Sequence, residues 1–355
     1  MHIHELLQYA VKNGASDIHI SAGEAPMLRT KGEMVRVKSP PLSPDEAKRL
    51  IYSVMNEVQK SKLEEVMELD FSIGLKGLAR FRVNAFVHTR GMGAVFRVIP
   101  VEIIPLSKLS LPQIVTDFTR YKKGLVLVTG PTGSGKSTTL AAIINEINQT
   151  RSDHILTIED PVEFHHKPKK CLITQREIGP HSHSFSNSLK SALRQDPDVI
   201  LIGELRDIET ISLALTAAET GHLVFGTLHT KSAPETIDRM IDVFPAEQQG
   251  QARAMLSEAL RAVMCQNLMK TKDGNSRVCA YEIMVCTHGI RNLIREGKIF
   301  QINSMMQTSS KEGSITLEQC LKDLVGRGRV HKHDAIDLSG NANLFSEAGI
   351  GRSGR

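Results

Sequence analysis

Residues 130–138 read GPTGSGKST, and this stretch decides the fold class. Its glycines and its Lys-Ser pair have the spacing of a phosphate-binding loop, G-x-x-x-x-G-K-S. Glycine lets consecutive backbone N–H groups turn toward a phosphate without a Cβ in the way, and the lysine supplies a positive charge. We therefore expect nucleotide contacts along the loop, from Pro131, Thr132, Gly133, Ser134, Gly135, Lys136, Ser137 and Thr138.

The segments on either side of the loop have the context that this motif requires. An apolar run at 125–129 predicts a buried strand before it, and residues 136–148 predict a helix after it. The amino end of a helix carries a partial positive charge, which favours a bound anion. The sequence therefore predicts an ATP site in which Lys136 contacts the phosphates and Ser137 is a ligand of Mg²⁺.

Three further apolar runs alternate with helical segments, at residues 155–158, 199–202 and 223–227. Such alternation is typical of a parallel sheet covered by helices. Glu204 follows the second run, where a Walker B acid would reach Mg²⁺ directly or through water. Glu163 follows the first run and could polarise the attacking water. His229 follows the third run at the same edge of the sheet, and is a candidate sensor of the γ-phosphate.

Other charged and imidazole side chains are less informative. Arg82 and Arg97, like Arg80, lie on predicted strands, and ring-forming ATPases need an arginine supplied in trans; spacing alone does not select these residues. For His222, at the start of a strand, a structural and a functional role stay open. His181 and His183 have no further ligand at useful spacing and are interpreted as polar loop residues.

The chain divides into regions with different patterns. Residues 1–99 predict a small mixed sheet with flanking helices, and Pro100 and Pro105 mark a linker at 100–112. Residues 113–338 predict the ATPase domain, mainly helical past 245 except for a hairpin that turns at 272–275. Residues 339–355 predict a disordered tail. In the first region we expect strands at 17–21, within 27–38, and at 69–75, 79–88 and 93–99, and helices at 3–11 and 43–62.

Composition bounds the class of protein. Lys plus Arg is 44 against 39 for Asp plus Glu, and aromatic residues make up only 4%, so no nucleic-acid partner is expected. The five cysteines have no metal or redox spacing, which favours a reducing compartment. The chain carries neither a signal-peptide pattern nor an apolar run long enough to span a membrane, so we expect a cytoplasmic protein.

Four boxes together resemble one family, the type II and type IV secretion ATPases. GPTGSGKST is similar to their Walker A motif, TIEDPVEF (157–164) to their Asp box, LIGELRD (201–207) to Walker B and GHLVFGTLHT (221–230) to their His box. The opening GASDIHIS (14–21) and GIRNLI (289–294) resemble the pilus-retraction branch, in which the first residue of the latter is alanine. The longer amino-terminal regions and paired-CxxC element of the extension and secretion branches are missing.

The resemblance implies an α/β fold, with a PAS-like α+β domain followed by a RecA-like P-loop domain with a helical carboxy-terminal part. It implies a homohexameric motor that uses ATP and Mg²⁺ for type IV pilus retraction, pilin disassembly and twitching motility. Glu163 would be the general base and Glu204 the Walker B acid, and Arg82 and Arg97 would contact the nucleotide. The partners would be an inner-membrane platform protein and, indirectly, the pilin fibre, with the motor at the cytoplasmic face of the inner membrane.

Three alternatives remain open from the sequence. The first is an extension or type II secretion ATPase of the same superfamily. The second is a RecA-like nucleic-acid translocase, for which no aromatic stacking platform is visible. The third is an accessory subunit that binds nucleotide without hydrolysis, which the intact acids Glu163 and Glu204 disfavour.

Overall fold

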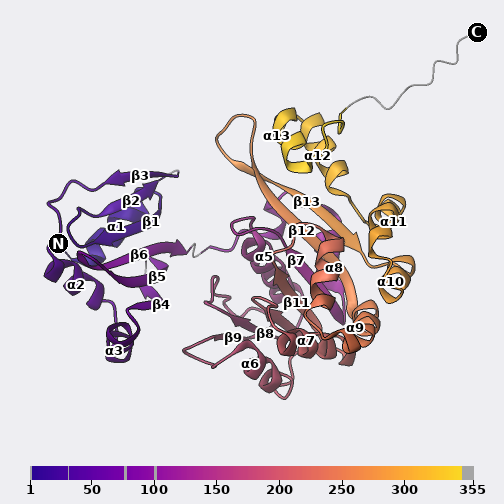
Figure 1. Ribbon diagram of the computed structural model, residues 1–355, viewed down its shortest axis with the longest axis horizontal. Coiled ribbons are helices and arrows are strands. Elements are labelled where there is room, and N and C mark those ends of the chain that lie inside the picture. Colours follow the sequence, from indigo (N-terminus) through magenta and orange to yellow (C-terminus); the bar gives the residue numbers. More distant parts are fainter. Residues whose placement is uncertain (1, 31, 76–77, 100–101, 346–355) are drawn as a thin grey trace, which may run out of the picture. The chain divides into compact units, whose positions relative to one another are not determined.

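The computed structural model describes residues 2–30, 32–75, 78–99 and 102–345 (Figure 1). The chain forms two compact units, Met1–Glu102 and Ile103–Arg355. The predicted linker falls at this division. Residues 100 and 101 lie outside the described residues, and Leu106–Lys108 form a short 3-10 turn, η1, in the second unit.

The first unit is a six-stranded sheet in the order β3-β2-β1-β6-β5-β4. In its described residues every strand pair is antiparallel, so the predicted mixed sheet is corrected to an antiparallel one. Alternate residues of β5, including Phe81 and Val83, are buried in one core, because successive side chains of a strand point to opposite faces. The elements are α1 Ile3–Lys12, β1 Ala15–Ser21, β2 Met27–Thr30, β3 Glu33–Arg36, α2 Pro44–Tyr52, α3 Glu57–Val66, β4 Glu68–Leu75, β5 Ala79–His88 and β6 Gly91–Ile99.

The single helix predicted at 43–62 is wrong, because the structure has two helices there. Ser43 caps α2 by accepting a hydrogen bond from the Glu46 N–H at 3.3 Å, as its capping box predicts. A second capping box begins α3, where the Asn56 side chain accepts from the Gln59 N–H at 2.9 Å. Asparagine competes for backbone hydrogen bonds, which is why it starts a new helix rather than continuing the old one.

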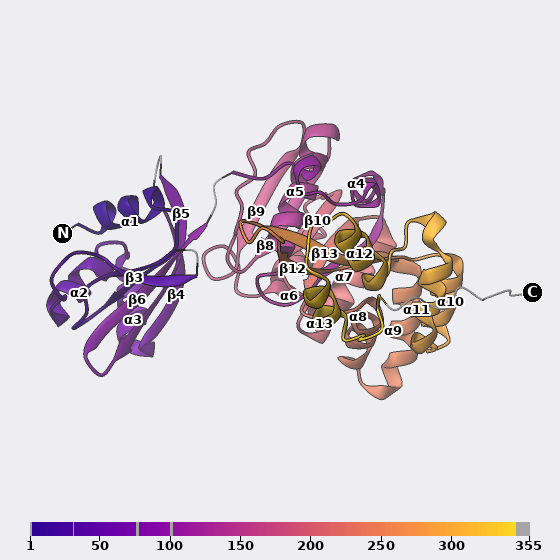
Figure 2. The same cartoon turned by 90° about the horizontal axis from the view of Figure 1, so that it is seen from above.

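The second unit is a seven-stranded sheet in the order β13-β12-β7-β11-β10-β8-β9. Leu125 and Leu127 of β7 face one buried cluster, and Val126 and Val128 face another. Helix α5 covers one side of the sheet, and α7, α8 and α9 cover the other (Figure 2). Its main elements are β7 Gly124–Thr129, α5 Lys136–Thr150, β8 His154–Glu159, β9 Leu172–Glu177, α6 Phe185–Ala192, β10 Val199–Ile202, α7 Ile208–Thr220, β11 Leu223–Leu228, α8 Ala233–Asp242 and α9 Ala246–Ala259.

The remainder of this unit differs from the mainly helical region that was predicted. The hairpin is long, with β12 Leu260–Lys270 and β13 Arg277–Val285, and β12 pairs in parallel with β7, so the hairpin extends the main sheet. Helices follow it, and none of the described helices is long and apolar enough to cross a membrane. These are α10 His288–Arg295, α11 Ile302–Thr308, α12 Leu317–Gly326 and α13 Lys332–Ser339, and α4 Gln113–Asp117 precedes the sheet.

Part of the predicted disordered tail packs against this unit. Leu344 is only 2% exposed and belongs to a small apolar cluster with residues of α12 and α13. The Asn341 side chain donates a hydrogen bond to Glu318 at 2.8 Å. Residues 346–355 lie outside the described residues.

Candidate functional site

The strand order brings the predicted site residues to one edge of the second sheet. Strands β7, β11, β10 and β8 are consecutive neighbours, and all three pairs are parallel. Their carboxyl ends therefore lie together, which is the edge where ligands bind in open parallel sheets. The glycine-rich loop follows β7, His229 follows β11, Glu204 follows β10, and Glu163 lies beyond the end of β8.

The loop has the backbone shape that a phosphate cradle needs. Gly135 is the N-cap of α5 with φ 92°, and no side chain caps that helix, so its first N–H groups are available to an anion. Gly130 has φ 136°, and a Cβ there would collide with the Gln266 carbonyl oxygen. The Ser134 hydroxyl is buried and has no hydrogen-bond partner among the described residues. Buried polar groups are nearly always paired, so this orphan fits a loop built to hold a ligand.

Lys136 bonds to the backbone of the loop and lies within the electrostatic influence of the two predicted acids. Its Nζ donates hydrogen bonds to the Gly130 and Pro131 carbonyl oxygens, at 2.7 and 3.1 Å. Burial lowers the pKa of this ammonium, whereas the carboxylates of Glu204 and Glu163 act in the opposite direction. The structure thus brings each of the two acids within electrostatic reach of the lysine.

The Glu204 carboxylate contacts one arginine and one histidine. Arg206 donates to Glu204 Oε2 at 2.6 Å, and His229 Nε2 lies 3.4 Å from Glu204 Oε1. Burial acts to raise the pKa of the Glu204 carboxyl, but the hydrogen bond and charge of Arg206, together with His229, hold it below its usual range. Arg206 was not among the predicted residues. Its position only two residues beyond Glu204 was the available signal.

A second carboxylate, Glu159, supports the loop that carries Glu163. Its Oε1 accepts from the Thr157 hydroxyl at 2.7 Å, and its Oε2 accepts from the Glu163 N–H at 3.4 Å. Burial raises the pKa of Glu159 to about 7, although these hydrogen bonds act against the shift. The sequence alone did not single out Glu159, because nothing in its spacing shows that its carboxyl is half-buried.

We expect Glu159→Gln to gain stability relative to wild type as pH rises. The pKa of the Glu159 carboxyl is about 7 in the folded chain and near 4.5 in the unfolded chain, because the folded state disfavours the ion. The wild-type free energy of unfolding therefore falls as pH rises from about 4.5 to 7, and glutamine, which does not ionise, avoids this loss. The relative gain between pH 5 and pH 8 should be about 2 kcal/mol. Urea unfolding at both pH values measures it, and an equal difference at the two would contradict the burial of this charge.

The structure places Arg82 and Arg97 in the first unit as a direct cross-strand pair of β5 and β6. Arg97 Nε donates to Asp17 at 2.9 Å, and Arg82 Nε lies 3.7 Å from Asp70. Burial acts to raise the pKa of the Asp17 carboxyl, but its bonds to Arg97 and Ser16 hold it below its usual range. Like charges directly opposite each other destabilise a sheet, so this pairing is consistent with an anion-binding surface. Contact of these arginines with a nucleotide stays a prediction.

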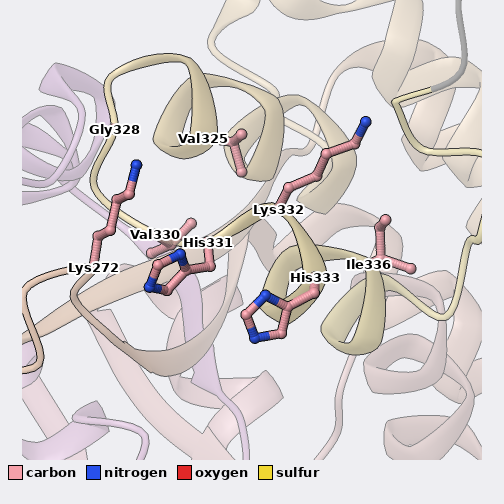
Figure 3. A pocket seen from close by; sticks show the side chains of 8 residues that line it. All are labelled: Lys272, Val325, Gly328, Val330, His331, Lys332, His333 and Ile336. Carbon is pink, nitrogen blue, oxygen red and sulfur yellow. The ribbon is translucent and has the colours of Figure 1, made fainter.

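Two further histidines bond to backbone groups outside the loop. His222 Nδ1 is 3.0 Å from the Ala217 carbonyl oxygen, at the amino end of β11, and so supports the turn after α7. His181 Nδ1 accepts from the Glu177 N–H at 3.0 Å, and no group of metal-binding side chains occurs among the described residues. A cavity of about 530 Å³ opens between the hairpin tip at Lys272 and α13, and none of the predicted nucleotide contacts line it (Figure 3).

A sheet whose central strands are parallel, with this loop, this lysine and two acids beyond strand ends, defines the P-loop class of nucleotide-binding proteins. The family model of the Type II/IV secretion system protein matches residues 1–336, and the chain belongs to this family.

Relatives within the family are similar over most of the chain. The chain is 54% identical to the type IV pilus retractation ATPase PilT of Pseudomonas aeruginosa, in an alignment that spans 94% of this chain and 97% of that protein. It is 56% identical to a twitching motility protein of Neisseria gonorrhoeae, over 90% of this chain and 86% of that protein. The crystal structure of the pilus retraction motor PilT with bound ADP matches at TM-score 0.91 and 47% identity, over 97% of this chain and 98% of that one. The predicted fold class and family resemblance are confirmed.

Proposed function

We propose that this chain is a Mg²⁺-dependent ATPase that works as a homohexamer to retract type IV pili. One observation carries the proposal. Lys136, Glu163, Glu204 and His229 gather around a phosphate-binding loop, in a chain 54% identical to a retraction ATPase. ATP-driven retraction would serve pilin disassembly and twitching motility. The partners would be a platform protein of the inner membrane and, through it, the pilin fibre, which places the motor at the cytoplasmic face.

Each side chain then has a distinct part in hydrolysis. Lys136 exchanges its two carbonyl contacts for the phosphates, which it neutralises, and the open amino end of α5 orients them. Glu163 accepts a proton from the attacking water. Ser137 and Glu204 would hold Mg²⁺, whose charge would offset the negative charge that develops on the leaving ADP. His229, in contact with Glu204, would respond to the γ-phosphate.

The coupling of hydrolysis to movement would involve the first unit. Arg82 and Arg97 would bring positive charge to the phosphates from that unit. Their approach and withdrawal would move the unit about the predicted linker, residues 100–112, as a hinge. A ring of such subunits would pass successive closures to the platform protein.

We expect Glu204→Ala to slow hydrolysis strongly and to prevent retraction while the ring still assembles. Loss of the acid that helps hold the metal should lower kcat by roughly 100-fold, because metal-ion charge stabilisation is worth several kcal/mol. ATPase rate and oligomer mass are measured together on wild type and variant. Cells that carry the variant in place of wild type should show excess pili that do not retract.

Glu235→Ala is the matched control, because it removes a glutamate of the same unit that accepts from the Lys231 N–H at 2.8 Å. It should hydrolyse ATP normally. Loss of pili on deletion of the chain would instead favour extension or secretion. Stimulation of the ATPase by DNA or RNA would favour a translocase, and a wild-type ring without turnover would favour an accessory subunit.

A further inference from the structure

The segment between β8 and β9, residues 160–166, carries Glu163 and is fastened by its main chain at four points. Before and at Glu163, the N–H of Val162 donates to Glu177 Oε2 at 3.1 Å and the N–H of Glu163 donates to Glu159 at 3.4 Å. On the carboxyl side of Glu163, the Gln175 side chain bonds to the main chain of both Phe164 and His166. Its Nε2 donates to the Phe164 carbonyl oxygen at 2.9 Å, and its Oε1 accepts from the His166 N–H at 2.9 Å.

The strand that supplies these side chains is placed by its pairing. β9 is the edge strand of the sheet and runs parallel to β8, with Gln175 beside Thr157 and Glu177 beside Glu159. Residues 175 and 177 share a face, because side chains two apart on a strand point the same way. The hydroxyl of the neighbouring Thr174 instead lies 2.9 Å from His154 Nε2.

From this arrangement we infer that Gln175 is a positioning residue for ATP hydrolysis, which sets the place of Glu163 by bonding the main chain on its carboxyl side. The inference rests on the proposed role of Glu163 as general base. A base must lie within hydrogen-bond reach of the proton that it abstracts, so a loose loop would lose rate without losing nucleotide.

Glutamine suits this position because it holds a donor and an acceptor on one neutral group. Gln175 Nε2 also lies 3.3 Å from Glu159 Oε1, so the same amide supports the half-buried carboxyl that receives the Glu163 N–H. A carboxylate at 175 would lack the donor for Phe164 and would add charge next to Glu159. An apolar side chain would leave the Phe164 and His166 main-chain groups without their partner.

The test uses the full chain, with Gln175→Met as the variant and Thr174→Val as the matched control on the same strand. Gln175→Met should lower kcat by about tenfold to a hundredfold, because small misplacements of a reacting group have effects of that size. KM for ATP should change by less than about threefold, as expected for an interaction that acts in the transition state. Thr174→Val should leave kcat within about twofold of wild type, like other substitutions away from the reacting groups.

A double-mutant cycle with Glu163→Gln separates positioning from a general structural effect. If Gln175 acts through Glu163, Gln175→Met should lower kcat no further once Glu163 is already glutamine. An equal loss in both backgrounds, or equal losses in Gln175→Met and Thr174→Val, would overturn the inference. Full activity of Glu163→Gln would overturn the proposed base, and with it the inference, whereas an inactive Glu163→Gln beside a normal Gln175→Met would remove the inference alone.

Amide hydrogen exchange gives a readout that does not depend on activity. In Gln175→Met the His166 amide should exchange faster than in wild type, while the Val162 amide, held by Glu177, should keep its rate. Unchanged exchange at His166 would contradict the anchoring contact. If the melting temperature shows that Gln175→Met does not fold, Gln175→Asn serves as the second variant, because it keeps the amide on a shorter side chain and should show a smaller loss of the same kind.

Discussion

Glu163→Gln is expected to reduce kcat for ATP hydrolysis by roughly 10²- to 10⁴-fold, the usual contribution of a general base. Glutamine has nearly the same shape as glutamate but cannot accept a proton from water. The variant should still bind nucleotide, because Lys136 and the loop are unchanged. Steady-state ATPase assays and binding of a fluorescent ATP analogue measure the two properties on the same preparation.

Glu146→Gln is a suitable control for this variant, since Glu146 lies on α5 of the same unit, near the far end of the helix from the loop. It should retain wild-type kcat. Activity within a few-fold of wild type in Glu163→Gln would show that another group activates water. Loss of nucleotide binding would show that the substitution disturbs the loop rather than the proton transfer.

Arg82→Ala is expected to lower kcat by roughly 10³-fold, because an arginine that neutralises transition-state charge in trans contributes 10³ to 10⁵. Arg82 is the better of the two arginines to replace. Its ion pair with Asp70 is long and partly exposed, whereas Arg97→Ala would leave the buried Asp17 carboxylate without its closest cation. Asp70→Ala, which removes the partner but keeps the arginine, should retain activity, and melting temperatures check that each variant folds.

Mixing two inactive chains tests whether the arginine serves a neighbouring subunit. Lys136→Ala chains have a damaged loop and an intact arginine, and Arg82→Ala chains have the reverse. Rings assembled from both should regain part of the wild-type ATPase rate if arginines act between subunits. Mixed rings without recovery would assign the arginine to the same subunit as its loop, and normal hydrolysis in Arg82→Ala alone would remove its proposed role.

Sequence reasoning succeeded where function depends on local chain geometry. The glycine spacing of the loop and the apolar runs before Glu204 and His229 each specify a strand, a turn and a side chain within a few residues. Parallel strands share an edge, so the neighbourhood of the acids followed without knowledge of their order. The resemblance to the family extended this reasoning to the whole chain.

It failed where an element depends on distant partners. β9 was missed because Gln175, Arg176 and Glu177 carry no apolar alternation, and only pairing with β8 makes them a strand. The hairpin of β12 and β13 was expected, but its union with β7 was not, since pairing between strands more than a hundred residues apart leaves no local signal.

The sequence by itself determined that this chain has a phosphate-binding loop between a buried strand and a helix, because Gly130, Gly135 and Lys136 act through short-range backbone geometry and charge. Only the tertiary structure decided which other side chains hold the acids and the Glu163 segment in place beside that loop. It left the Glu159 carboxyl half-buried beside the Gln175 amide, and it brought Gln175 across from an edge strand to the segment that carries Glu163. Those contacts join residues through strand order and burial, which arise from packing of the whole sheet and not from any one stretch of the chain.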